Sequence, residues 1–173
     1  MKKVQLDLPV SETDWMGSPD KSWLKEVEFP ASDYFQRMKN IRDLKQFWLT
    51  GISWYISGGV HQLQFSSNDG KQSEIFGGSY SDWHLTTVDV IGPEIRAVQV
   101  WWNEDGLRGI HFLDNQGKIL VGDYDACKGF LEVDSTLFKL DTTQVLVGVR
   151  LRVAGGVFGY VGAIKLKLAT FDL

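Results

Sequence analysis

Alternating apolar and polar residues predict strands in the last third of the chain. In the segments 145–153 and 163–170, aliphatic residues tend to stand at every second position with lysine or arginine between them. The aliphatic residues are Val149, Leu151, Val153, Ile164, Leu166 and Leu168, and the basic residues are Arg150, Arg152, Lys165 and Lys167. Because side chains alternate between the two faces of a strand, this pattern predicts two strands with a buried aliphatic face and an outward basic face.

Two earlier strand pairs are related by a repeat. Segment 59–71 aligns without a gap to segment 106–118, and the residues identical in both copies are Gly59/Gly106, Phe65/Phe112, Asn68/Asn115, Gly70/Gly117 and Lys71/Lys118. Both copies end in a turn sequence, Asn-Asp-Gly or Asn-Gln-Gly, whose residues tolerate positive φ and close hairpins. The chain therefore uses one strand-rich unit more than once.

The pair at 145–153 and 163–170 repeats this layout more loosely, with a glycine-rich break at 154–162. A small sheet on its own has too little core to be stable, but three such sheets around one axis can bury their inner faces together. The sequence therefore predicts an all-β domain of three small sheets.

The segment before these units is less regular. We interpret residues 1–40 as an N-terminal extension and residues 41–173 as the domain. Within the extension, Val4, Leu6, Leu8 and Val10 alternate with polar residues and predict a short strand, followed by a loop at 11–21. Residues 32–46 fit either a helix capped by Ser32 or Asp33, or a strand entering the sheet, and both interpretations stay open.

Composition narrows the possible functions. The 173 residues fit one soluble domain, and a net charge of −4 disfavours general nucleic-acid binding. A single cysteine, Cys127, excludes an intramolecular disulfide and favours a reducing compartment. Neither a standard signal peptide nor a stretch of transmembrane length is evident. We therefore expect a cytoplasmic protein, or one secreted without a standard signal peptide.

Residue types that carry catalysis are not grouped in any familiar pattern. The three histidines, His61, His84 and His111, lack the spacing of metal ligands. No motif for a serine nucleophile, a nucleotide or a dinucleotide is present. We expect no enzyme activity, no metal and no cofactor. The 18 glycines instead fit tight turns between short strands. The seven tryptophans fit aromatic contacts, either in the core or against a sugar.

The glycines and alternating aliphatics at 76–78, 95–100, 106–112, 147–149 and 159–164 resemble the jacalin-like lectin family, over roughly residues 45–170. The resemblance implies a β-prism of three antiparallel Greek-key sheets around a pseudo-threefold axis. It also implies non-catalytic carbohydrate binding through glycine-rich loops at one end of the prism. In the family the last loop carries an aspartate that accepts sugar hydroxyls, and here Gly162 stands at that position. The chain is thus similar to a divergent member.

The resemblance places a ligand site where the turns of the three units converge. Phe158 and Tyr160 are expected to flank or stack on the sugar, and backbone amides around 159–162 to donate hydrogen bonds. The candidate ligand-binding residues are Gly58, Gly59, His61, Asp105, Arg108, Phe158, Gly159, Tyr160, Val161 and Gly162.

Two alternatives accompany this interpretation. Without the loop aspartate, the domain could instead have lost sugar binding and serve as a protein-interaction or assembly module. The outward residues Arg150, Arg152, Lys165 and Lys167 could also form a basic patch for a sulfated or phosphorylated ligand. The expected partners are therefore a glycan or glycoprotein, an anionic ligand on that patch, and a second copy of the chain.

Overall fold

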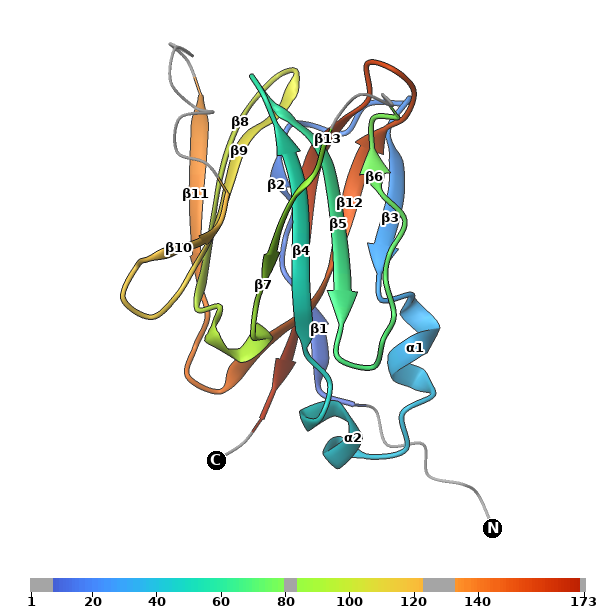
Figure 1. Cartoon of the computed structure of the whole chain (residues 1–173), viewed down its shortest axis with the longest axis vertical. Coiled ribbons are helices and arrows are strands. Elements are labelled where there is room, and N and C mark those ends of the chain that lie inside the picture. The colour runs from blue at the N-terminus through green and yellow to red at the C-terminus, as the bar shows by residue number, and fades with distance from the viewer. Residues whose placement is uncertain (1–7, 80–83, 123–132, 172–173) are drawn as a thin grey trace.

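The structure is a computed structural model that describes residues 8–79, 84–122 and 133–171. Three antiparallel sheets stand side by side around a common core (Figure 1). The first contains β4 (Leu49–Ile56), β5 (Val60–Ser67), β6 (Phe76–Gly77) and β7 (Thr86–Asp89) in the order β6-β5-β4-β7. The second contains β8 (Ala97–Asn103), β9 (Gly106–Leu113), β10 (Ile119–Val121) and β11 (Asp134–Lys139) in the order β10-β9-β8-β11. In both, the fourth strand returns to lie beside the first, which is a Greek key.

The two copies of the sequence repeat hold equivalent places in these sheets. One copy runs through β5 into the turn at 68–70, and the other runs through β9 into the turn at 114–117. Each turn contains a glycine with positive φ, Gly70 at 86° and Gly117 at 78°. A residue with a β-carbon is strained in this region, which explains why glycine recurs at this point of the repeat.

The third sheet joins the two ends of the chain. Its central strands are β12 (Gln144–Ala154) and β13 (Tyr160–Thr170), and β1 (Val10–Glu12), β2 (Met16–Gly17) and β3 (Lys25–Phe29) complete it. β1 and β2 pair with β13, and β3 pairs with β12. Residues 10–29, which lie in the expected N-terminal extension, thus cover both open edges of the β12–β13 ribbon. Val4 and Leu6 of the expected first strand lie outside the described residues.

Residues 32–46 form two short helices, α1 (Ser32–Gln36) and α2 (Ile41–Lys45). The helical alternative is therefore correct, but the expected cap is not. The Ser32 hydroxyl and amide bond to Glu28, whereas the Asn40 side chain caps α2 by accepting from the Asp43 amide at 3.0 Å. Phe35 and Leu44 of the two helices share a small apolar cluster with Val147 of β12, so both helices cover one end of the third sheet. None of the helices in the described ranges is long and apolar enough to cross a bilayer.

The main core lies between the three sheets. The predicted aliphatic face is buried here, with Val149, Leu151, Ile164 and Leu166 each at 0% exposure. Side chains of the other sheets meet it in one cluster that includes Ile52, Leu63, Phe65, Val98, Val100, Ile110 and Phe112. Full burial of such side chains contributes roughly 1.5–3 kcal/mol each, so this shared core is what holds the three sheets together.

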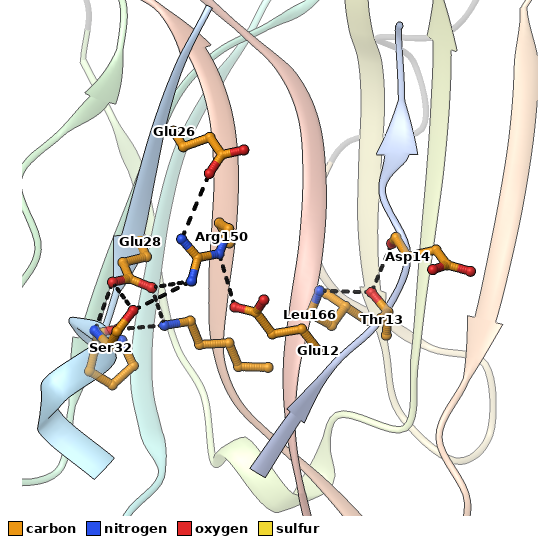
Figure 2. Close-up of polar contacts among 10 residues, drawn as sticks. Glu12, Thr13, Asp14, Glu26, Glu28, Ser32, Arg150 and Leu166 are labelled. Carbon is orange, nitrogen blue, oxygen red and sulfur yellow. Dashed lines mark hydrogen bonds and ion pairs between the residues drawn. The ribbon is translucent and has the colours of Figure 1, made fainter. Parts of the chain in front are cut away.

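The outer face of the third sheet carries a ladder of charges. Its central strands are basic and its edge strands are acidic, and the register places Glu12 opposite Lys167 and Glu28 opposite Arg150. Figure 2 shows Arg150 between three carboxylates, with Nε 3.0 Å from Glu12 and Nη2 2.9 Å from Glu28. The Glu26 carboxylate is 3.9 Å from Arg150 Nη1.

Lys167 is the most enclosed member of this ladder, at 3% exposure. Its Nζ donates to Glu28 Oε2 at 2.6 Å and to the Pro30 carbonyl at 2.8 Å. Burial alone would raise the pKa of Glu28, but hydrogen bonds from Lys167 and Ser32 outweigh it and hold that pKa below its usual value. A buried ammonium requires such a partner, because an unpaired charge in this place is strongly destabilising.

The hypothesis of an open basic patch is therefore corrected. All four basic residues do lie on the outer face, but the N-terminal segment covers them. The Trp15 ring lies 4.1 Å from the Arg152 guanidinium and 5.1 Å from Lys165 Nζ. Asp20 lies 3.8 Å from Arg152 Nε. Periodicity correctly indicated the face, but the neutralising carboxylates come from a distant segment that periodicity does not connect to it.

We expect the Glu28–Lys167 pair to matter far more than its neighbours. The substitution Glu28→Gln leaves Lys167 without an ionised partner and should lower the free energy of unfolding by about 3 kcal/mol at neutral pH. Glu26→Gln is the matched control, because the Glu26 side chain is 52% exposed and should contribute less than about 0.5 kcal/mol. Urea denaturation of both variants measures this, and equal losses would contradict the assignment.

The Glu28–Lys167 pair should make the free energy of unfolding depend on pH. Because the pKa of Glu28 is lowered by folding, its stabilisation is complete above the ordinary carboxyl value of 4.5 and is lost as pH falls through the lowered pKa. The difference in unfolding free energy between wild type and Glu28→Gln should therefore shrink below pH 4.5. A constant difference across that range, measured by urea denaturation, would contradict it.

A glycine on β12 lets the N-terminal segment dock. A β-carbon on Gly148 would lie 2.4 Å from the Phe29 carbonyl oxygen and 2.6 Å from Pro30 Cδ, so Gly148→Ala should destabilise the fold by about 1–3 kcal/mol. Gly155→Ala is the control, since nothing lies within 4 Å of its added carbon. Thermal denaturation should show a lower Tm only for Gly148→Ala, and an unchanged Tm there would show that β3 can shift freely.

Candidate functional site

Turns from all three sheets meet at one end of the molecule, which we call the loop end. It comprises the β4–β5 turn at 57–59, the β8–β9 turn at 104–105 and the β12–β13 loop at 155–159, near the top of Figure 1. Side-chain contacts join these turns directly. Arg108 Nη1 donates to the Gly58 carbonyl at 2.6 Å, and His61 Nδ1 lies 3.4 Å from the Gly159 carbonyl. The structure thus brings together the three turns from which the candidate residues come.

Arg108 braces two of these turns. Besides Gly58, its guanidinium bonds to Asn103 Oδ1 at 3.0 Å and to Asp105 Oδ2 at 3.2 Å, and its side chain is only 17% exposed. Gly59 leaves room for this crossing, because a β-carbon there would lie 3.1 Å from Arg108 Nη1. Arg108 thus connects the β4–β5 turn to the β8–β9 turn, and it also contacts the exposed Asp105 carboxylate.

His61 ties the first turn to the last loop. Its Nε2 lies 2.8 Å from the Ser57 carbonyl, in addition to the longer contact with Gly159. Its ring also lies 5.8 Å from that of Tyr55. His61 is half-buried by these neighbours, so it too stabilises the loop end rather than projecting from it.

The β12–β13 loop combines a fixed base with an exposed tip. The Gly156 carbonyl accepts from the amides of Gly159 at 3.0 Å and Ser79 at 2.9 Å. Gly159 packs closely on Gly78, whose Cα would lie 2.5 Å from an added β-carbon. Phe158, in contrast, is 93% exposed. The expected aromatic character is therefore present at the tip, on a loop whose ends are tied down.

Tyr160 connects this loop to the N-terminal segment. Its hydroxyl accepts from the indole nitrogen of Trp23 at 3.0 Å, and its ring packs against Gly106, where a β-carbon would lie 2.8 Å from Cδ2. Lys21 Nζ lies 5.3 Å from the Trp23 ring and bonds to the Glu104 carbonyl. Trp23 is thus a component of the loop end.

Four of the candidate residues are buried, namely Gly59, Gly159, Val161 and Gly162. Val161 is at 0% exposure, and Gly162 is buried beneath the N-terminal segment. The Gly162 carbonyl accepts from both the amide and the hydroxyl of Ser18, at 3.0 and 3.1 Å, and a β-carbon would lie 3.1 Å from Leu24 Cδ1. Ser18 and Leu24 therefore cover Gly162, the position that the resemblance equates with the aspartate of the family. The prediction that Val161 and Gly162 contact a ligand finds no exposed residue at these two positions to support it.

A cleft of about 740 Å³ opens beside the β8–β9 turn. It lies between the second sheet and the end of β2, and its lining residues are Gly17, Pro19, Trp102, Asn103, Glu104, Asp105, Val133 and Asp134. Trp102 provides an apolar wall, and β11 places Asp134 directly opposite it in register. The cleft therefore combines an aromatic surface with three carboxylates.

Sequence reasoning identified only Asp105 among these cleft residues as a ligand contact. The tandem Trp101-Trp102 and the run Asn103-Glu104-Asp105 are visible in the sequence, but a tryptophan is more often core, and a polar run is more often only a turn. Asp134 follows a segment without clear strand alternation, so its pairing with Trp102 could not be inferred.

A second hollow of about 600 Å³ lies at the opposite end, between α1, α2 and the turn at 68–71. Burial and the hydrogen bond to Asp69 raise the pKa of Tyr34, and Lys71 Nζ lies 4.1 Å from the Tyr34 ring. Burial would raise the pKa of Asp69, but hydrogen bonds from Ser67 and Tyr34 lower it. In this hollow the polar groups of Tyr34, Asp69 and Lys71 contact one another, so we do not treat the hollow as a candidate binding site.

Within residues 8–79, 84–122 and 133–171, no three side chains of His, Cys, Asp or Glu gather in a way that could hold an ion. His84 is exposed, and His111 packs on the Trp101 ring at 4.6 Å. Cys127 lies outside the described residues.

Comparisons with known proteins agree with this architecture. No protein-family model and no curated protein sequence matches the chain. Among solved structures, Malaysian banana lectin matches with a TM-score of 0.62 and 12% identity, over 94% of this chain and 99% of that one. AcmJRL, a mannose-binding jacalin-related lectin from Ananas comosus, matches with a TM-score of 0.59 and 15% identity, over 94% and 99%.

A larger protein shares the fold as well. The V. cholerae biofilm matrix protein Bap1 matches with a TM-score of 0.59 and 12% identity, over 94% of this chain. The chain spans only 24% of the Bap1 chain. The chain has three antiparallel sheets around a shared core, and solved jacalin-related lectins match it over almost its whole length. We conclude that the chain has the β-prism fold of the jacalin-related lectins.

Proposed function

We propose that this domain is a non-catalytic carbohydrate-binding module whose site is the cleft beside the β8–β9 turn. The observation that carries the proposal is the juxtaposition of Trp102 with Asp105 and Asp134 at the loop end. A sugar presents both a C–H face and several hydroxyl groups. The Trp102 wall suits the former, and carboxylate oxygens accept from the latter.

The Asp105 acceptor is oriented by two contacts with its neighbours. Asp105 is held by Arg108, and its own backbone amide donates to Asn103 Oδ1 at 2.9 Å. A carboxylate already positioned by the protein loses little freedom when a hydroxyl binds, so more of the interaction energy is retained. Because the Asp105 side chain is 77% exposed, a ligand can still reach it.

The cleft also contains carboxylate acceptors for sugar hydroxyls, which the β12–β13 loop lacks. With Gly162 covered by the N-terminal segment, hydroxyl acceptors on this side of the domain come from the second sheet instead. The fold is shared with AcmJRL, a mannose-binding lectin, and this supports carbohydrate as the ligand class. The proposal therefore retains the end of the prism but moves the site from the last loop to the neighbouring unit.

A glycan array followed by titration tests the proposal. The full chain should bind selected neutral glycans, and Asp105→Asn and Asp134→Asn should each weaken binding at least about tenfold, because hydrogen bonds to charged groups contribute roughly 1.5–3 kcal/mol. Asp89→Asn is the matched control, since Asp89 is an exposed carboxylate on β7 of the first sheet.

The outcomes separate the two functions considered for this fold. Loss of binding in both cleft variants with no effect of Asp89→Asn would support the proposal. Binding that survives both cleft changes would place the sugar elsewhere. A folded protein that binds no glycan would favour the protein-interaction module.

A further inference from the structure

The tip of the β12–β13 loop exposes two adjacent apolar side chains that the sugar cleft does not use. Phe158 is 93% exposed and Val157 is 52% exposed. Among the large exposed hydrophobic residues in the described ranges, Phe158 has the greatest exposed fraction. Neither residue lines the cleft beside the β8–β9 turn. Such exposure is unfavourable in water and is typical of a contact surface.

The exposure of this tip is imposed by the loop. Gly156 has φ of 88°, and its carbonyl accepts from the amides of Gly159 and of Ser79, which follows β6. Gly159 is clamped between the Ala154 carbonyl and Gly78, which would lie 2.4 and 2.5 Å from an added β-carbon. Since both ends are fixed, the tip stands away from the body, at the loop end in Figure 1.

Residues behind the tip have the character of a membrane–water boundary. Tyr160 follows the tip as the first residue of β13 and is half-buried. Its hydroxyl bonds to Trp23, and Lys21 lies against the Trp23 ring. Tryptophan and tyrosine favour the headgroup layer, where one side of the ring is apolar and the polar group stays hydrated. With this pair at the headgroups, Phe158 would reach the acyl chains.

The charges at the loop end favour one class of lipid headgroup over another. The exposed carboxylates Asp20, Glu104 and Asp105 surround the loop end, and the whole chain has a net charge of −4. These charges repel anionic lipids, whose surface attracts lysine and arginine. A zwitterionic surface carries no such penalty.

We propose that the Val157–Phe158 tip inserts into the outer layer of a zwitterionic, phosphatidylcholine-type bilayer, with Trp23 and Tyr160 at the headgroup level. Insertion is peripheral and reversible, because two side chains bury less apolar surface than one myristoyl chain, which itself gives a binding constant of only about 10⁴ M⁻¹. The proposal is independent of the sugar cleft, since neither tip residue lines it.

Vesicle flotation at millimolar lipid tests the proposal with the full chain and sugar-free phosphatidylcholine vesicles. Phe158→Ser should reduce the partition coefficient at least about tenfold, as expected for removing a fully buried phenylalanine, and Phe158→Trp should retain it. Ile91→Ser is the matched control, because Ile91 is 54% exposed and follows β7 at the opposite end. Phe158 makes no core contact, so Phe158→Ser should keep the wild-type circular dichroism spectrum.

Each result decides the matter. Binding that is lost in Phe158→Ser, kept in Ile91→Ser and not increased by anionic phosphatidylglycerol would support the proposal. Absence of wild-type binding, or equal binding by wild type and Phe158→Ser, would overturn it and leave a protein pocket as the partner of the tip. Binding that requires anionic lipid would also overturn it. Soluble-glycan affinity of Phe158→Ser, measured in parallel, reports on the sugar cleft separately.

Discussion

Burial of the Lys167 ammonium is the constraint on which the third sheet depends. This side chain is 3% exposed on a face where Arg150, Arg152 and Lys165 add further positive charge. Arg150 stands directly opposite Lys165 in register, an arrangement that is unfavourable for like charges. The central ribbon therefore requires carboxylates on both flanks, and the edge strands β1 and β3 provide them through Glu12 and Glu28.

Docking of these edge strands also determines the shape of the loop end. Between β1 and β3 the chain crosses that end, where Ser18 covers Gly162 and Trp23 bonds to Tyr160. Lys21 links the same segment to the β8–β9 turn, beside the cleft. Electrostatic pairing on the outer face of one sheet thus places the residues that close the last loop and border the neighbouring cleft.

The parts of this fold that could be predicted are those encoded by local patterns. Alternation around Leu151 and Leu166 gave the correct strands and buried face, and the turns at Gly70 and Gly117 gave the hairpin ends. The role of residues 10–29 could not be predicted in the same way, because partners such as Glu28 and Lys167 are far apart in sequence and nothing local relates them. Likewise, the convergence of turns followed from the fold, but the burial of Gly162 depends on a distant Ser18.

The charge ladder has a practical meaning for fragments of this protein. A fragment that begins at residue 41, where the domain was expected to begin, would lack Glu12, Glu26 and Glu28 but keep all four basic residues. An acidic protein would then present an uncovered cationic face, and polyanions such as sulfated glycans would bind to it without any sugar specificity. Ligand screens on such a fragment would report a property of the exposed ribbon that the full chain neutralises internally.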